Sequence, residues 1–180
     1  MKAAPCLSVA VLVAVVACVE GDGEEERMGA TLSVTSTAFL HEGSIPPRHA
    51  CDGDDISPDI SWEGLPEATR SVALICDDPD AVGVWVHWVV FNIPADVGGL
   101  PEGVPGDATL SNGALQGENS WGSIGYGGPC PPTGSHHYIF TVYALDVALP
   151  LEAGASKRAV LDAMSGHVLA QGELVGVYPG

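Results

Sequence analysis

The segment from Gly127 to Asp146 constrains the fold of this chain more than any other. Its first half is dense in proline and glycine, which makes the backbone a stiff, irregular loop. Its second half is rich in β-branched and aromatic residues, the composition of a strand. Side chains alternate along a strand, so His136 and Tyr138 should share one face and His137 should lie on the other. We expect the central strand of a two-layer β structure, with His136 and Tyr138 at its pocket end.

Length and composition bound the fold and the possible partners. The chain has 180 residues, of which 46% are hydrophobic and 16% charged, values that suit one compact domain plus an appendage. Six basic residues stand against 23 acidic ones, for a formal net charge of -17. A nucleic-acid backbone would be repelled, so we expect no nucleic acid as a partner.

The appendage is the N-terminus. The apolar run from Leu7 to Ala17 is shorter than the roughly 20 residues that span a bilayer, and it predicts a signal peptide over 1–17. A small residue before Cys18 resembles a bacterial lipoprotein signal, which would place a lipid on Cys18. Ordinary cleavage that leaves a periplasmic or secreted protein is the alternative, and both readings predict export. We read 18–30 as an acidic tether and 31–180 as the domain, which would meet a membrane only through the lipid anchor.

Three cysteines fall inside the domain. Cys76 lies in an apolar run and should be buried. Cys51 and Cys130 lie in polar, turn-rich segments, and in an exported protein they could pair, although two free thiols or, less favourably, a zinc site remain alternatives. The aspartates that follow Cys51 lack the spacing of a calcium-binding loop, so we interpret Asp52–Asp55 as a solvated acidic turn.

Shorter patterns predict the other elements. Apolar runs indicate strands over 31–37, 60–62, 71–76, 85–94 and 173–178. Apolar residues spaced by three and four predict one amphipathic helix over 153–172. The glycine-rich stretch 95–128 is long for a connection, and we expect it to cover the pocket.

Polar side chains occur just after one of these strands and inside another. Asp78 and Asp80 follow the strand that ends at Cys76, and His87 lies inside the strand 85–94. By alternation His87 should share a face with Val89. A lone histidine in an apolar strand is most often a core group, but a third polar cluster at His136 favours a functional interpretation.

These segments together resemble a known family. The motifs are Cys51-Asp52-Gly53 with Ser57-Pro58, Asp78-Pro79-Asp80-Ala81, Trp85-Val86-His87-Trp88, Gly128 to Tyr138, and Gly166-His167. In this order they resemble the phosphatidylethanolamine-binding protein family, in its bacterial Raf-kinase-inhibitor-like branch. The resemblance implies a mainly β fold: a two-sheet antiparallel Greek-key sandwich with a C-terminal helix. It also implies no cofactor and a small anion pocket, formed by Asp78, Asp80, His87, Gly128, Pro132, His136 and Tyr138.

Two positions depart from the family pattern. Val82 stands where the aspartate motif usually has proline, and His137 stands where an arginine usually separates the motif histidine and tyrosine. The second change puts an arginine-dependent partner contact in doubt more than it does ligand binding, because alternation directs His137 away from the pocket.

The residue types suit a binding protein. Imidazole N–H groups, a phenol and backbone amides can bind phosphate or carboxylate oxygens, while the aspartates can orient the imidazoles or receive an ammonium group. We therefore expect a phosphorylated small ligand whose affinity falls as pH rises through the histidine range. One alternative is a protease or kinase inhibitor that acts through its surface. Another is a metal-dependent hydrolase with Asp78, His87 and His136 as ligands, which the spacing does not favour.

Overall fold

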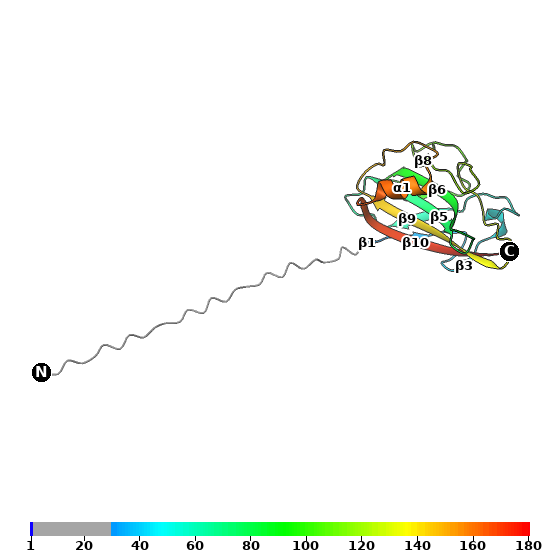
Figure 1. Cartoon of the computed structure of the whole chain (residues 1–180), viewed down its shortest axis with the longest axis horizontal. Helices are drawn as coiled ribbons and strands as arrows, with labels where there is room; N and C mark the ends of the chain where they lie inside the picture. The colour runs from blue at the N-terminus through cyan, green and yellow to red at the C-terminus, as the bar shows by residue number, and fades with distance from the viewer. Residues whose placement is uncertain (2–29) are drawn as a thin grey trace.

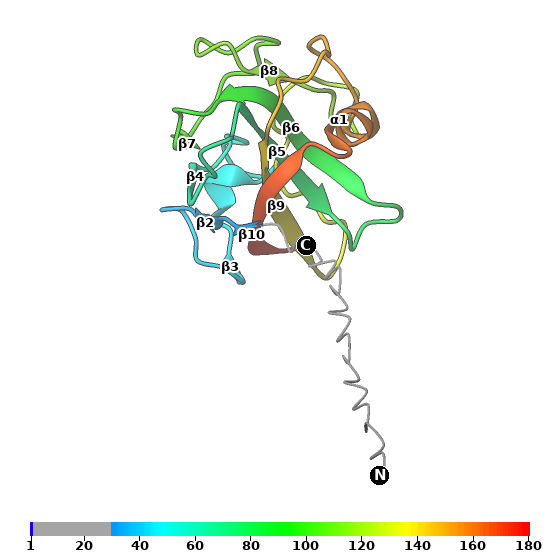
Figure 2. The ribbon, with the colours of Figure 1, turned by 90° about the vertical axis from the view of Figure 1, so that its left-hand side faces the viewer.

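Two β-sheets pack face to face in the computed structural model, which describes residue 1 and residues 30–180. The larger sheet has the strand order β1-β10-β9-β5-β6-β8, with β3 also pairing β10 (Figure 1). The smaller sheet has the order β2-β4-β7 (Figure 2). The elements are β1 (Ala30–Thr31), β2 (Ser33–Thr35), β3 (Gly43–Ser44), the 3-10 helix η1 (Pro47–His49), β4 (Ile60–Glu63), β5 (Ser71–Asp78), β6 (Trp85–Pro94), β7 (Gly99–Leu100), β8 (Leu115–Gln116), β9 (Ser135–Leu145), α1 (Lys157–Met164) and β10 (Val168–Pro179).

The fold class expected from the sequence is confirmed: residues 30–180 form a mainly β protein with two sheets and a single α-helix near the C-terminus. Most neighbouring strands run antiparallel, but β1 and β3 run parallel to β10. The signal peptide, the tether and the lipid site at Cys18 lie outside the described residues. Within residues 30–180, no helix is long and apolar enough to cross a bilayer.

The core has two parts, one on each face of the large sheet. Figure 2 shows the small sheet on one side of the large sheet and α1 on the other. Trp88 and Phe140 lie in the cluster between the sheets, while Val89 and Phe91 lie in the cluster covered by α1. Strand β5 is buried on both faces, which explains why its sequence is a continuous apolar run.

The helix predicted over 153–172 is wrong at both ends. Helix α1 starts after Ser156, whose side chain caps it by accepting from the Ala159 N–H at 3.3 Å, and it ends at Met164. Gly166 has a φ of 81°, which a helix interior does not allow. Residues from Val168 onward alternate between exposed and buried, so they form the first part of β10 and extend the expected last strand.

The long segment 95–128 contains β7 and β8 and is anchored by side-chain hydrogen bonds. Gln116 is fully buried, accepts from the Trp88 indole N–H at 2.8 Å and donates to the carbonyls of Pro105 and Asp107. These bonds satisfy the polar groups of an irregular segment that covers part of the large sheet.

A disulfide joins Cys51 to Cys130, the pairing that the sequence left as one alternative among three. The two residues are 79 positions apart in sequence, and their Cα atoms are 5.4 Å apart. Both residues are exposed, whereas Cys76 is a free, buried thiol. The bond fastens the segment between η1 and β4 to the loop that precedes β9.

Replacing both cysteines in a Cys51→Ser, Cys130→Ser variant should lower the free energy of unfolding by roughly 2–4 kcal/mol, because a long loop is no longer closed in the unfolded chain. Urea unfolding with and without dithiothreitol measures this. Reductant should destabilise the wild-type protein and leave the double variant unchanged. Equal unfolding midpoints for the two proteins in the absence of reductant would contradict the expectation.

Candidate functional site

A pocket of about 580 Å³ lies at the end of the large sheet where β5 ends and β6 and β9 begin. Tryptophan, proline, alanine and valine side chains form much of its wall, and the titratable groups in it are two aspartates and two histidines. The lining residues are Asp78, Asp80, Ala81, Val82, Trp85, His87, Trp121, Cys130, Pro131, Pro132, Thr133 and His136.

Five of the seven residues assigned to the site from the family motifs line this pocket: Asp78, Asp80, His87, Pro132 and His136. The other two lie behind the lining. Tyr138 is 1% exposed, and its hydroxyl has no hydrogen-bond partner among the described residues. The Gly128 N–H donates to Asp55 Oδ1 at 2.7 Å and is therefore already occupied within the protein.

Asp78 organises the turn after β5 and one of the histidines. Its Oδ1 accepts the backbone N–H groups of Asp80 at 2.9 Å and Ala81 at 3.1 Å, and its Oδ2 accepts Nδ1–H of His136 at 2.7 Å. These three hydrogen bonds fix the carboxylate between the turn and the start of β9. Since Nδ1 of His136 carries the proton of this contact, Nε2 is the ring nitrogen left for a ligand.

Asp80 forms a second pair with the next histidine. Its Oδ2 accepts both the backbone N–H of His137 at 2.8 Å and Nδ1–H of the His137 ring at 2.7 Å. These hydrogen bonds lower the pKa of Asp80. The turn between β5 and β6 is thus joined to the start of β9 by two adjacent aspartate–histidine pairs. The His137 side chain is about half exposed and does not line the pocket.

His87 reaches the pocket through a β-bulge. Cys76 pairs with Trp88 and Asp77 pairs with Val86, which leaves His87 without a partner on β5. The extra residue turns the His87 ring toward Tyr138, which lies in the cluster between the sheets, whereas Val89 lies in the cluster under α1. The expectation that His87 shares a face with Val89 is therefore wrong. Its ring lies edge-on between two aromatic rings, with centroids 5.0 Å from Trp121 and 5.0 Å from Tyr138.

The tautomer of His87 follows from its backbone partner. Its Nδ1 lies 2.7 Å from the Gly127 carbonyl oxygen, which can only accept, so Nδ1 carries the proton. Burial lowers the pKa of His87, and the Gly127 carbonyl and the Asp78 carboxylate offset part of that effect. At neutral pH the ring is therefore uncharged, with an unprotonated Nε2.

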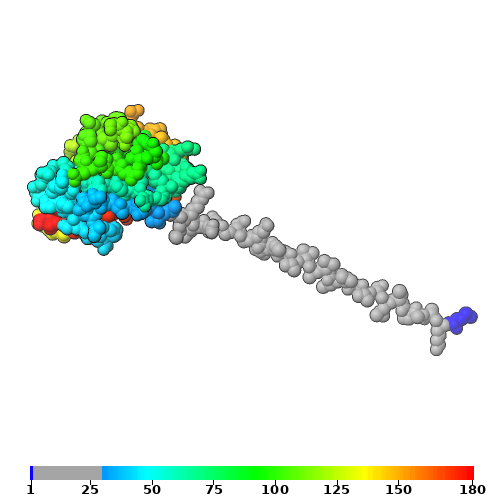
Figure 3. Space-filling model, turned by 180° about the vertical axis from the view of Figure 1, so that it is seen from behind, coloured from blue at the N-terminus to red at the C-terminus, as the bar shows by residue number. Residues whose placement is uncertain are grey.

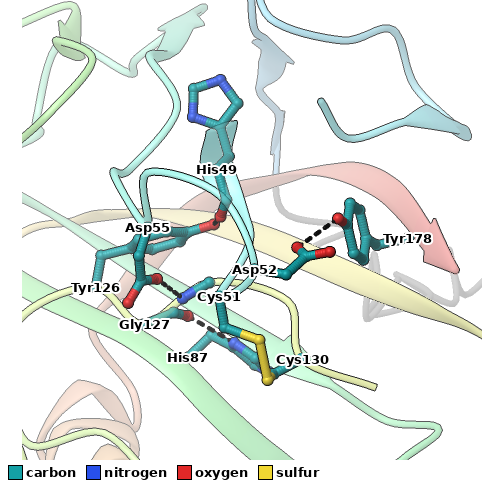
Figure 4. The surroundings of a disulfide bond; sticks show 10 residues. His49, Cys51, Asp52, Asp55, His87, Tyr126, Gly127, Cys130 and Tyr178 are labelled. Carbon is teal, nitrogen blue, oxygen red and sulfur yellow. Dashed lines mark hydrogen bonds between the residues drawn. A yellow bond between two sulfur atoms is a disulfide. The ribbon is translucent and has the colours of Figure 1, made fainter. Parts of the chain in front are cut away.

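The acidic turn after Cys51 is not simply solvated, contrary to the interpretation of the sequence. Asp52 Oδ1 accepts the hydroxyl of Tyr178 at 2.7 Å, and Asp55 Oδ1 accepts the Gly128 N–H (Figure 4). Sequence reasoning missed Asp55 because nothing local distinguishes it from Asp54. Trp85 and Trp121 also line the pocket, which the sequence analysis did not predict.

Comparisons with known proteins agree with this architecture. A UPF0098 protein of Methanothermobacter thermautotrophicus is 54% identical over 148 residues, which cover 82% of this chain and 98% of the relative. The crystal structure of Escherichia coli YbcL, described as a new member of the mammalian PEBP family, superposes with a TM-score of 0.78 at 37% identity and covers 84% of this chain and 99% of YbcL. That of a PEBP homologue from Chlamydia trachomatis gives a TM-score of 0.76 at 41% identity, with coverages of 83% and 98%.

The family model described as phosphatidylethanolamine-binding protein matches residues 35–179. These matches and the two-sheet fold define a PEBP-like β protein. The chain belongs to the phosphatidylethanolamine-binding protein family.

The buried, neutral His87 should make stability depend on pH. The unfolded chain binds a proton at this residue near pH 6.5, whereas the folded pKa is lower, so the free energy of unfolding should fall as pH drops below about 6.5. Urea unfolding at pH 7.5 and 5.5 measures the loss. A His87→Asn variant keeps an N–H donor for the Gly127 carbonyl but does not titrate. Its free energy of unfolding should therefore fall less between pH 7.5 and 5.5 than that of the wild type. Equal losses in both proteins would refute the assignment.

Proposed function

We propose that this protein is an exported binding protein whose pocket holds a small phosphate-bearing ligand, either a free phosphomonoester or a phospholipid headgroup. The observation that carries the proposal is the pair of imidazoles in the pocket lining, each held through Nδ1 by an acceptor of the protein. Both rings thereby keep Nε2 for a ligand. The proposal also rests on membership in the phosphatidylethanolamine-binding protein family.

The charges of the pocket define how a phosphate would bind. No lysine or arginine occurs among the lining residues, and the carboxylates of Asp78 and Asp80 already accept hydrogen bonds from the protein. Phosphate oxygens need donors, and an imidazole that carries its proton on Nδ1 donates from Nε2 only when the ring takes up a second proton. A phosphate dianion would therefore be bound by the protonated form of the ring, and for His87 this means that a proton is taken up with the ligand.

The rest of the pocket suits the organic part of such a ligand. A volume of about 580 Å³ falls within the usual range of small-molecule sites and leaves room beyond a phosphate group. The rings of Trp85 and Trp121 lie edge to face, with centroids 5.3 Å apart, on the apolar wall. They provide contact area for carbon atoms next to the phosphate.

We propose binding over hydrolysis. The metal-hydrolase alternative needs Asp78, His87 and His136 to converge on one ion, but the Asp78 carboxylate already accepts two backbone N–H groups and the Nδ1–H of His136. Among residues 30–180, no group of three or more histidine, cysteine or acidic side chains is placed to hold a metal ion. Metal analysis of the purified protein separates the two functions, because stoichiometric zinc would favour the hydrolase.

Export is part of the proposal. It is supported by the signal-like run that ends at Ala17 and by the exposed disulfide, since such bonds persist in oxidising compartments. We propose a lipid anchor at Cys18, which holds the domain at a membrane surface of the bacterial cell envelope.

Isothermal titration with phosphoethanolamine should detect binding that is tighter at pH 6 than at pH 8. Replacing His87 or His136 by alanine should weaken binding at pH 6 by about tenfold or more, because each substitution removes a hydrogen bond between charged groups. Titrations at pH 7.5 in buffers of different ionisation enthalpy should show net proton uptake.

The matched control is His167→Ala. His167 donates from Nδ1 to Asp146 Oδ1 at 2.8 Å, the same type of pair as His136 and Asp78, but at the other end of β9. This variant should bind like the wild type. Equal affinity of wild type and His87→Ala, or no binding by the wild type, would remove the proposed function.

Lipid attachment is tested with the full chain expressed in a bacterium. The wild-type protein should partition into the detergent phase of Triton X-114 and carry acyl chains on Cys18, as measured by mass spectrometry, whereas Cys18→Ser should remain aqueous. A wild-type protein that is exported, aqueous and unmodified would leave export standing and remove the anchor.

A further inference from the structure

The loop Cys51–Asp55 is joined to the segment Gly127–Cys130 by several independent contacts (Figure 4). The disulfide connects Cys51 with Cys130, the Cys51 N–H donates to the Pro129 carbonyl at 3.0 Å, and Asp55 Oδ1 accepts the Gly128 N–H at 2.7 Å. Close by, the Tyr126 hydroxyl donates to the His49 carbonyl at 2.8 Å. The position of one loop is therefore determined by the other.

One peptide group connects Asp55 to the pocket. The Gly127 carbonyl, which accepts from His87 Nδ1, and the Gly128 N–H, which donates to Asp55, belong to the same peptide bond. Both hydrogen bonds measure 2.7 Å. A carboxylate on the N–H side polarises the peptide and makes its carbonyl a stronger acceptor, because hydrogen bonds in a chain reinforce one another. Asp55, the peptide and His87 thus form a continuous chain of hydrogen bonds.

The backbone is constrained on both sides of this contact. Asp55 has a φ of 54°, in the left-handed region that non-glycine residues rarely occupy. A Cβ atom at Gly128 would lie 2.3 Å from the His49 carbonyl oxygen and 2.8 Å from Asp55 Oδ1, so only glycine allows the peptide to approach so closely. Backbone strain of this kind persists only where the surroundings hold it, and it gathers at functional sites.

We propose that Asp55 is a positioning residue of the pocket, which acts on His87 through the Gly127–Gly128 peptide as Asp78 acts directly on His136. Each pocket imidazole then has its own carboxylate, one in direct contact and one beyond a peptide group. The effect on ligand affinity rests on the proposed function, whereas the effect on the His87 ring does not.

Other groups around His87 keep their places when Asp55 is changed. The rings of Trp121 and Tyr138 contact His87 edge-on, and the carboxylates of Asp77 and Asp78 favour its charged form. None of them takes part in the Asp55 hydrogen bond. Asp54 offers a matched control, because it is exposed, neighbours Asp55 and makes no side-chain hydrogen bond within the described part of the chain.

The test compares Asp55→Asn, Asp55→Ala and Asp54→Asn in the full domain. Asparagine still accepts the Gly128 N–H but without charge, and alanine removes the acceptor. Nitrogen-15 NMR of the His87 imidazole should show a lower pKa and a smaller fraction of the Nδ1–H tautomer in the order wild type, Asn, Ala. Asp54→Asn should match the wild type. Phosphoethanolamine affinity at pH 6 should fall by about three- to tenfold in Asp55→Ala.

An unchanged His87 titration and tautomer in Asp55→Asn and Asp55→Ala overturns the proposal. If Asp55→Ala fails to fold, Asp55→Asn decides, since it differs from the wild type only in charge and one amide group. A purely structural role for Asp55 would lower the unfolding midpoint in urea without altering the imidazole spectrum. A shift of the His87 titration in a protein that does not bind phosphoethanolamine supports the positioning role and removes the proposed function.

Discussion

The burial of β5 on both faces is the constraint on which the rest of the structure depends. A strand between two apolar layers has no room for a polar side chain along its length, so polar groups gather where it ends. Asp77 and Asp78 are its last residues, and each carboxylate accepts a hydrogen bond from a basic side chain. Asp77 accepts from Lys157 at 2.6 Å, and Asp78 accepts from His136 at 2.7 Å. The two carboxylates lie on opposite sides of the sheet. One ties the helix to the sheet, and the other forms the base of the pocket.

Local sequence patterns were sufficient to predict the strands and their buried faces where side chains alternate without interruption. His136, Tyr138 and Phe140 are two residues apart in a regular strand, and Tyr138 and Phe140 lie in the core between the sheets. The strands around Ile60, Leu74 and Val90 were likewise found from apolar runs. The residue types and their order also pointed to the family. The fold brings the motifs around Cys51, Asp78, His87 and His136 to one end of the large sheet, whereas His167 lies at the other end of β9.

Prediction failed where the outcome depends on how two distant segments align. The bulge at His87 is a property of the register between β5 and β6, and no pattern inside β6 shows it. Val168 and Leu169 fit a helical spacing, but the turn at Gly166 and pairing with β9 make them a strand. The partner of Asp55 lies 73 positions away, and the cysteine pairing was open because both ends sit in irregular loops.

The position of β1 in the large sheet has a consequence for the proposed attachment of the protein. Ala30 in β1 pairs with Ala170 near the start of β10, whereas His136 beside the pocket pairs with Tyr178 near the end of β10. Figure 3 shows these blue and red ends of the domain on opposite sides. The two pairings are eight positions apart along β10, which corresponds to roughly 26 Å. If the protein is attached through its N-terminal side as proposed, the opposite pole with the pocket is left open to solution, and the proposed anchor and the proposed ligand would not compete for the same surface.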